Sequence, residues 1–253
     1  MSIFGVPDLL GIYSIRRIFL ISNTLLIAFS CITASANTLH IACPLKVSSP
    51  YHQWGQNILS EVQADLGISI NLMSYPELRS IAELKQGSID GICGVSKALY
   101  RNRLEEAILI PVVIAKAEIE LWSKDKSYFI ELSDNPQVLD FNLGYYRGGT
   151  IEILLDKYNL SNPIAVASTE QGLKMLAAGR IDAFVATNFN LWASRDMLKL
   201  DQLNVEIQKI ALGNVDMYFV LHFRHENIAA KFSWYLDKAV QKYGGPIRFK
   251  NSY

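Results

Sequence analysis

Apolar runs and amphipathic helical patterns alternate along the chain from residue 39 onward. Residues 39–43 and 68–72 are typical of strands, because they are short, rich in apolar positions and followed or preceded by turn residues. Between them, residues 51–66 place apolar side chains four positions apart, which predicts a helix. A second helical pattern at 77–86 and an apolar run at 91–94 follow. Strands that alternate with helices predict an α/β fold with a parallel sheet and right-handed crossovers.

One phrase occurs twice in the chain. The first copy is residues 84–91 (LKQGSIDG) and the second is residues 176–183 (LAAGRIDA), with Leu, Gly, Ile and Asp in the same register. Gly87 and Gly179 each follow a helical pattern, where glycine readily takes the left-handed conformation that ends a helix. A short apolar run, typical of a buried parallel strand, comes after each copy. The repeat predicts two similar α/β lobes, and ligands of such lobes tend to lie at the carboxyl ends of the strands.

The second half of the chain continues with strands and helices. A strand pattern at 142–146 leads through the turn 147–150 (RGGT) into a helix at 151–158. Further strands are predicted at 164–167, 183–186 and 217–223, and further helices at 170–178 and 227–243. No linker separates independent domains.

The N-terminus differs from the rest of the chain. Arg16 and Arg17 precede an apolar run at 18–32, and a small-x-small pattern ends at Ala36. These features predict a secretory signal peptide cleaved near Ala36, and therefore export to the periplasm. An uncleaved membrane anchor is one alternative, although the run is shorter than the roughly 20 residues that a membrane span needs. A lipoprotein anchored at Cys31 is another, although the residues before this cysteine make a poor lipobox.

Composition and charge are those of an ordinary globular protein. Of the 253 residues, 50% are hydrophobic and 19% are charged, and the formal net charge is zero. Without a basic excess, nucleic acid is not an expected partner. Removal of residues 1–36 leaves two cysteines, Cys43 and Cys93, and an exported pair permits a disulfide without requiring one.

Motifs for catalysis, metals and cofactors are weak or missing in this sequence. His222 and His225 are three residues apart, but no cysteine or acid completes a metal-binding set with convincing spacing. The sequence holds neither a Gly-x-Ser-x-Gly elbow nor a phosphate-binding loop. We therefore expect no cofactor, no metal and no enzymatic activity, with a small-acid lyase as a minor alternative.

The order of these motifs resembles the family 3 extracellular solute-binding proteins, the polar-amino-acid-binding components of ABC importers. The two Gly-x-Ile-Asp phrases match the two copies in that family. Residues 94–101 (GVSKALYR) stand where the family has Gly-x-(Ser/Thr)-x-Thr-x-x-Arg, and residues 147–150 stand at its Gly-Thr turn. Residues 231–253 resemble its closing helix pair. The resemblance runs from about residue 39 to residue 253, essentially the whole mature chain.

This resemblance implies the periplasmic binding protein type II fold: two Rossmann-like α/β lobes joined by two crossover strands, with ligand between them. It implies that residues 37–121 and 218–253 form lobe 1 and that residues 122–217 form lobe 2. The lobes of the family close on the ligand by a hinge motion.

The resemblance also assigns four ligand-binding residues. Arg101 matches the arginine that holds the ligand carboxylate, and a guanidinium suits this task because it donates two parallel hydrogen bonds. Ser96 matches a hydroxyl that binds the same carboxylate, and Gly149 and Thr150 open a helix whose free N–H groups favour an anion. Each has a structural alternative: Arg101 as a solvated charge, Ser96 as a backbone-bonded strand end, and the turn as a helix cap. Ala98 lacks the second hydroxyl that many members have.

Aromatic residues and Thr187 complete the predicted site. Tyr51 falls where the family places an aromatic against the ligand, whereas Trp54 fits the helix's apolar stripe and is expected in the core. One of Tyr145 and Tyr146 is expected to face the cleft. The second repeat ends in Thr187 where amino-acid binders usually have an aspartate that pairs with the ligand ammonium. The ligand therefore lacks an ammonium, or another acid reaches in, or ligand binding has been lost.

The implied fold makes the strands that end in Cys43 and Cys93 neighbours, so these residues form either a disulfide beside the cleft or two buried thiols.

The sequence thus predicts a monomeric periplasmic protein that closes on a small polar, carboxylate-bearing ligand for ABC-type uptake. An inner-membrane ABC permease is the expected partner. The alternative is a ligand-sensing module that signals to a membrane sensor without transport.

Overall fold

A computed structural model gathers the strands and helices into one unit, Thr38–Tyr253. It describes residues 38–45, 47, 49–125, 127–128, 139–156, 160–191, 194 and 208–248. The signal peptide predicted at 1–36 lies outside these residues, as does the lipoprotein alternative at Cys31. None of the helices within the described ranges is long and apolar enough to cross a membrane.

Lobe 1 alternates strands and helices as the sequence predicts. Its elements are β1 (Thr38–Cys43), α2 (Pro50–Leu66), β2 (Ser69–Ser74), α3 (Glu77–Lys85), β3 (Gly91–Ser96), α4 (Lys97–Arg103), a 3-10 turn (Phe223–His225), α9 (Glu226–Lys242) and β9 (Ile247–Arg248). Strand β1 pairs in parallel with β2 on one side and with β3 on the other. Helix α2 begins where the Ser49 hydroxyl accepts a hydrogen bond from the Tyr51 N–H, and it ends at Gly67 in the left-handed conformation, φ 67°.

Lobe 2 repeats this arrangement on a smaller scale. Its elements are β5 (Leu139–Tyr146), α6 (Thr150–Leu155), β6 (Leu160–Val166), α7 (Thr169–Ala177) and β7 (Ala183–Thr187). Strand β5 pairs in parallel with β6 and β7. The α/β class and the two-lobe arrangement predicted from the repeat are therefore confirmed.

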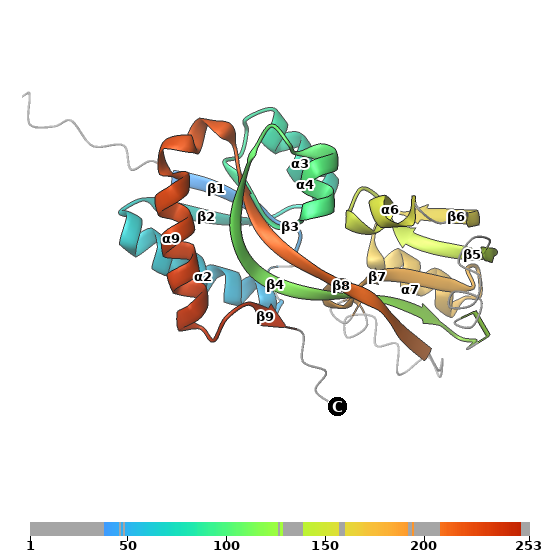
Figure 1. Cartoon of the computed structure of the whole chain (residues 1–253). Coiled ribbons are helices and arrows are strands. Elements are labelled where there is room, and N and C mark those ends of the chain that lie inside the picture. Colours follow the sequence, from blue (N-terminus) through green and yellow to red (C-terminus); the bar gives the residue numbers. More distant parts are fainter. Residues whose placement is uncertain are drawn as a thin grey trace, which may run out of the picture. The chain divides into compact units, whose positions relative to one another are not determined.

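Two long antiparallel strands, β4 (Ile108–Ser123) and β8 (Gln208–Leu221), connect the lobes (Figure 1). They create one sheet with the order β2-β1-β3-β8-β4-β7-β5-β6, and β9 pairs with β4. The pairing register shifts between Ile110 and Ala115, around Pro111, whose ring nitrogen has no hydrogen to donate to a neighbouring strand. The predicted lobe boundaries, at 121/122 and 217/218, both fall inside these crossing strands.

The two copies of the repeated phrase make the same contacts in the two lobes. In lobe 1, Asp90 exchanges hydrogen bonds with the backbone of His40: its N–H donates to the carbonyl at 2.8 Å, and its carboxylate accepts from the N–H at 2.8 Å. In lobe 2, Asp182 does the same with Asn142, at 3.0 Å and 2.8 Å. The repeated aspartate therefore fixes the start of one parallel strand against its neighbour, at the end of the sheet opposite to the carboxyl ends.

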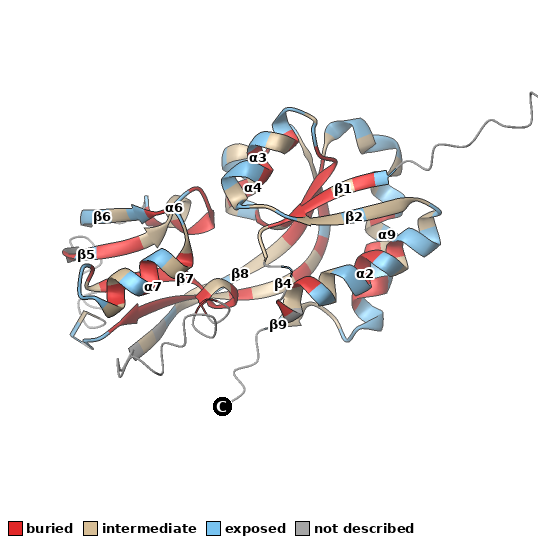
Figure 2. Cartoon of the chain, turned by 180° about the vertical axis from the view of Figure 1, so that it is seen from behind, coloured by how far each residue is buried: buried red, intermediate tan, exposed pale blue. Residues whose placement is uncertain are grey.

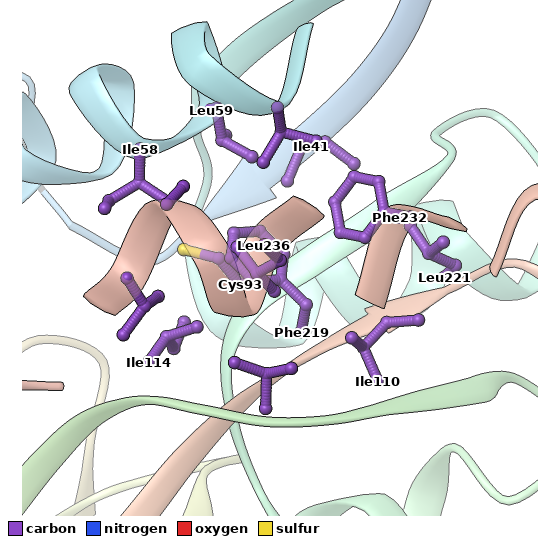
Figure 3. Close-up of a cluster of buried hydrophobic side chains, with 14 of the residues drawn as sticks. Ile41, Ile58, Leu59, Cys93, Ile110, Ile114, Phe219, Leu221, Phe232 and Leu236 are labelled. Atoms are coloured by element: carbon purple, nitrogen blue, oxygen red, sulfur yellow. The ribbon is translucent and has the colours of Figure 1, made fainter. Parts of the chain in front are cut away.

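Helices cover both faces of the sheet in each lobe, and buried residues concentrate between the layers (Figure 2). The largest cluster joins α2 and α9 to β1, β4 and β8, where Phe219 and Phe232 meet edge to face at 5.9 Å between ring centroids (Figure 3). On the opposite face, α3 and α4 pack on the same strands. This packing fixes the strand ends of lobe 1, from which the candidate site is built.

Candidate ligand-binding site

A cavity of about 100 Å³ lies where the carboxyl ends of parallel strands from both lobes converge. Lobe 1 contributes Cys43 at the end of β1 and Cys93 in β3. Lobe 2 contributes Tyr146 at the end of β5 and Thr187 at the end of β7. A single water needs on the order of 10–15 Å³ of such space, so the cavity has room for one small organic molecule.

Aromatic and aliphatic side chains make up most of the cavity wall. Tyr51 and Trp54 reach it from α2, and Phe189 reaches it from the short helical segment after β7. Tyr51 and Phe189 belong to different lobes and meet edge to face, with ring centroids 4.5 Å apart and an interplanar angle of 79°. This geometry is favourable for aromatic pairs, so the two rings hold the lobes together at one side of the cavity.

Glu77 is the charged residue of the cavity wall, within the part of the chain that the structure describes. It opens α3 directly after Pro76, and its carboxyl group lies against the backbone of Gly149 in lobe 2, where a Cβ atom would overlap it. Burial raises the pKa of this carboxyl to about 8; the nearby Arg103 charge opposes the rise and the Glu152 charge adds to it.

Two glycines in lobe 2 leave room for the N-terminal residues of α3 to pack closely against them. Gly149 leaves space for Glu77, and Gly148, at φ 87°, leaves space for Leu78, because a Cβ atom at either position would overlap the opposing side chain. The sequence identified the Gly-Gly turn but not its partner. An acid at the first position of a helix is usual, so nothing in the sequence marked Glu77 as a cavity residue.

Ser96 and Thr150 bond to each other across the lobes. Their hydroxyl oxygens are 2.8 Å apart and both residues are buried. The Ser96 hydroxyl also accepts a hydrogen bond from the Leu99 N–H at 3.1 Å, so it caps α4. Thr150 and Gly149 line the cavity, whereas Ser96 lies outside its lining.

Arg101 is exposed on α4 and lies outside the cavity lining. The neighbouring Arg103 instead makes the contact with lobe 2, where its Nη2 lies 2.9 Å from Oε2 of Glu152. The same carboxylate oxygen accepts a hydrogen bond from the Gly148 N–H at 2.6 Å. The ligand role predicted for Arg101 stays a prediction.

The remaining predicted residues reach the cavity. Tyr51 and Thr187 line it, and Thr187 leaves this position without an acid. Trp54 both lines the cavity and packs against the main core cluster. Of the two adjacent tyrosines, Tyr146 lines the cavity and Tyr145 packs against the core of lobe 2.

Cys43 and Cys93 form a disulfide, with Cα atoms 5.0 Å apart. Parallel pairing of Ala42 with Ile92 places the two cysteines side by side at the next position of β1 and β3. Both cysteines line the cavity. Of the two possibilities left open by the sequence, the structure has the disulfide, which links β1 to β3 at the cavity wall.

Sequence comparison identifies no relative: no protein-family model matches the chain, and no curated protein is significantly similar to it. Solved structures do share the fold. A histidine kinase sensor domain with similarity to periplasmic binding proteins superposes with a TM-score of 0.66 at 15% identity, covering 82% of this chain and 92% of that chain. The substrate-binding protein of an ABC uptake transporter from Streptococcus pneumoniae, with bound histidine, has a TM-score of 0.63 at 15% identity, covering 82% and 88%.

An ancestral amino-acid-binding protein, a precursor of cyclohexadienyl dehydratase, has a TM-score of 0.62 at 14% identity, covering 82% of this chain and 91% of that chain. Together these structures establish the class of fold, that of the two-lobed periplasmic binding proteins. At such low sequence identity, the structural similarity indicates the fold but does not indicate the ligand.

Proposed function

We propose that this protein is an exported solute-binding protein whose lobes close over a small molecule. The cavity between the strand ends carries the proposal, because both lobes line it and it lies at the carboxyl ends of β1, β3, β5 and β7. Ligands of open α/β sheets bind at this edge. A ligand held there stabilises the closed arrangement by contacting both lobes at once.

The crossing strands supply the hinge that such closure needs. Gly213, at φ 150°, lies opposite Ile119, and the register of β4 and β8 shifts directly after this pair. A glycine at a break in strand pairing permits a change of backbone angle at small cost. Hinge closure around ligands is typical of periplasmic binding proteins.

The ligand proposed on the resemblance is an amino acid or a related small polar molecule. Two of the structural neighbours, a substrate-binding protein with bound histidine and an ancestral amino-acid-binding protein, support this size and chemistry. For the carboxylate of such a ligand, the resemblance offers Arg101 and the turn at Gly149 and Thr150. For an ammonium, Glu77 supplies the acid that Thr187 does not.

Membership of solute-binding protein family 3, a periplasmic location and a monomeric state belong to the same proposal. An inner-membrane ABC permease would read the closed form. Sensing without transport is the second candidate, favoured by the contacts Tyr51–Phe189 and Ser96–Thr150, through which the lobes touch each other directly. A ligand that rearranges these contacts would change the position of one lobe relative to the other. A membrane sensor could detect that change of position.

Catalysis is the least supported candidate. A lyase needs a titratable group within reach of its substrate, and Glu77 is such a group. His225, which could share proton transfer, bonds Asp90 at 2.5 Å, at the opposite end of β3. We therefore propose binding and not turnover.

A thermal-shift screen of residues 37–253 against amino acids, amines, small carboxylates and peptides tests the function. We expect at least one compound to raise Tm, since a ligand at a hundredfold excess over Kd stabilises the folded state by about 2.7 kcal/mol. Thr187→Phe, which fills the cavity, should abolish this rise. Ser60→Phe, on the exposed face of α2, is the matched control. A full response from Thr187→Phe, or no response from any compound, would refute the proposal.

A further inference from the structure

Among the described lining residues of the cavity, Glu77 has the one carboxyl group, and it is negative only when it is ionised. Among the described lining residues there is no lysine, arginine or histidine, and Glu77 is the acid. A ligand carboxylate would therefore enter a cavity without a counter-charge. Desolvating an unpaired carboxylate costs several kcal/mol, so an anion is a poor occupant of this space.

Glu77 itself lacks a strong partner in the described structure. The nearby guanidinium of Arg103 bonds Glu152 at 2.9 Å, and the carboxyl of Glu77 faces the Gly149 backbone and the cavity. Burial without compensating hydrogen bonds disfavours the charged form, which is why the pKa of Glu77 is raised. A cation placed in the cavity would supply the missing partner.

The other residues that line the cavity suit the uncharged part of such a cation. Tyr51, Trp54 and Phe189 present aromatic rings, which attract ammonium groups through their negative faces, and aliphatic residues such as Ile114 and Ile151 cover the remaining surface. A small apolar skeleton would lose no hydrogen bonds on entering this cavity.

We propose that the cavity binds a small organic monocation, a protonated amine on an apolar or aromatic body without a carboxylate, and that Glu77 is its counter-ion. The inference rests on the proposed solute-binding function, and at the same site it replaces the amino acid suggested by the resemblance with an amine. It assigns to lobe 1 the acid that amino-acid binders carry at the position of Thr187.

Matched ligand sets test the charge preference directly. Three skeletons, n-butyl, cyclohexylmethyl and 2-phenylethyl, are each offered as the amine, the alcohol and the carboxylate, and Kd is measured by calorimetry at pH 7.5. We expect at least one amine to bind, with its alcohol and carboxylate at least tenfold weaker. Two buffers of different ionisation enthalpy should reveal proton release on amine binding, because Glu77 must ionise to pair with the cation.

Glu77→Gln keeps the shape of the side chain and removes its charge, so it should weaken amine binding tenfold or more and leave the alcohol unchanged. Glu83→Gln, on the same helix and outside the cavity lining, should bind like the wild type. The inference is overturned if carboxylates or zwitterionic amino acids bind and the amines do not, or if Glu77→Gln retains amine affinity. Those outcomes leave the proposed function standing, whereas a failure of every compound in the wider screen defeats both.

Discussion

The hydroxyl groups of Ser96 and Thr150 lie 2.8 Å apart and join the two lobes through a buried hydrogen bond. The sequence resemblance assigns both residues to the ligand. In this structure each hydroxyl has the other as its partner, and Ser96 also caps α4. Two groups that the resemblance assigns to a ligand carboxylate thus satisfy each other across the boundary between the lobes.

A double-mutant cycle measures the strength of this bond. Thr150→Val removes one hydroxyl with little change of shape and should lower the free energy of unfolding by about 1 kcal/mol. Ser96→Ala should cost more, by roughly a further 1 kcal/mol, because it also removes the helix cap. Urea unfolding of both single variants and of the double variant gives the coupling energy. A coupling near zero would mean that the bond contributes nothing to joining the lobes.

Arg101→Ala distinguishes the resemblance-based site from the one built on Glu77. Because Arg101 is exposed and lies outside the cavity lining, we expect its removal to change the Kd of any ligand found in the screen by less than twofold. Arg103→Ala, two residues away, serves as the comparison, since it breaks the contact with Glu152. A tenfold loss of affinity in Arg101→Ala would establish the carboxylate role that the resemblance implies.

Glu77 should make stability fall as pH rises. Its folded-state pKa of about 8 is above the ordinary value of 4.5, so between these values the folded protein holds a proton that the unfolded chain releases. Burial is the main cause; the charged groups nearest to Glu77 are Arg103, which opposes the shift, and Glu152, which adds to it, and Tyr146 lies close by. Glu77→Gln should therefore unfold at a Tm a few degrees above wild type at pH 8, with the difference vanishing near pH 4.5.

Thermal unfolding of wild type, Glu77→Gln and Glu83→Gln across pH 4.5 to 8 checks this sign. Glu83 forms an exposed ion pair with Arg79, so its variant should follow the wild-type curve. A Glu77→Gln variant that is less stable than wild type at pH 8 would mean that the ionised carboxylate has a favourable partner in the fold.

The local pattern of apolar and polar residues was sufficient to predict most of the fold. Alternation of strands and helices gave the α/β class, and the repeated phrase gave two lobes because each copy encodes the same helix end, glycine and strand start. Gly87 and Gly179 both take the left-handed conformation, at φ 73° and 66°. These features depend on neighbours within a few positions, which is what a periodic pattern records.

Contacts between distant segments were beyond that pattern. Glu77 reaches the cavity because Gly148 and Gly149 leave room for the N-terminus of α3. The sequence does not show that α3 packs against these glycines. The sequence has an apolar run at 108–114 around Pro111 and a strand pattern at 118–122, whereas the structure has one continuous strand, β4, whose pairing is interrupted around Pro111. Tertiary packing decided each of these outcomes.

The repeated aspartates offer a matched comparison of one motif in two settings. Asp90 and Asp182 each accept a hydrogen bond from the N–H of the neighbouring strand, but their other partners differ. Asp90 is buried and also receives Arg224 at 2.6 Å and His225 at 2.5 Å, whereas Asp182 receives the side-chain amide of Asn142 at 2.9 Å. Burial acts to raise the pKa of Asp90, but hydrogen bonds from His40, Arg224 and His225 outweigh it and hold the pKa below its ordinary value.

Asp90→Asn should therefore lower the free energy of unfolding by about 2–3 kcal/mol, because it leaves the Arg224 guanidinium without its carboxylate. Asp182→Asn keeps the acceptor oxygen that Asn142 uses and should cost under about 1 kcal/mol. The Asp90 contribution is present above the pKa of the unfolded aspartate, near 4, and is lost as pH falls through the lower folded-state pKa. Urea unfolding at pH 7 and near pH 3 should accordingly show the gap between wild type and Asp90→Asn narrowing in acid. Equal losses in the two variants at pH 7 would mean that the shared strand contact, and not the Arg224–His225 pair, accounts for the stability that the motif provides.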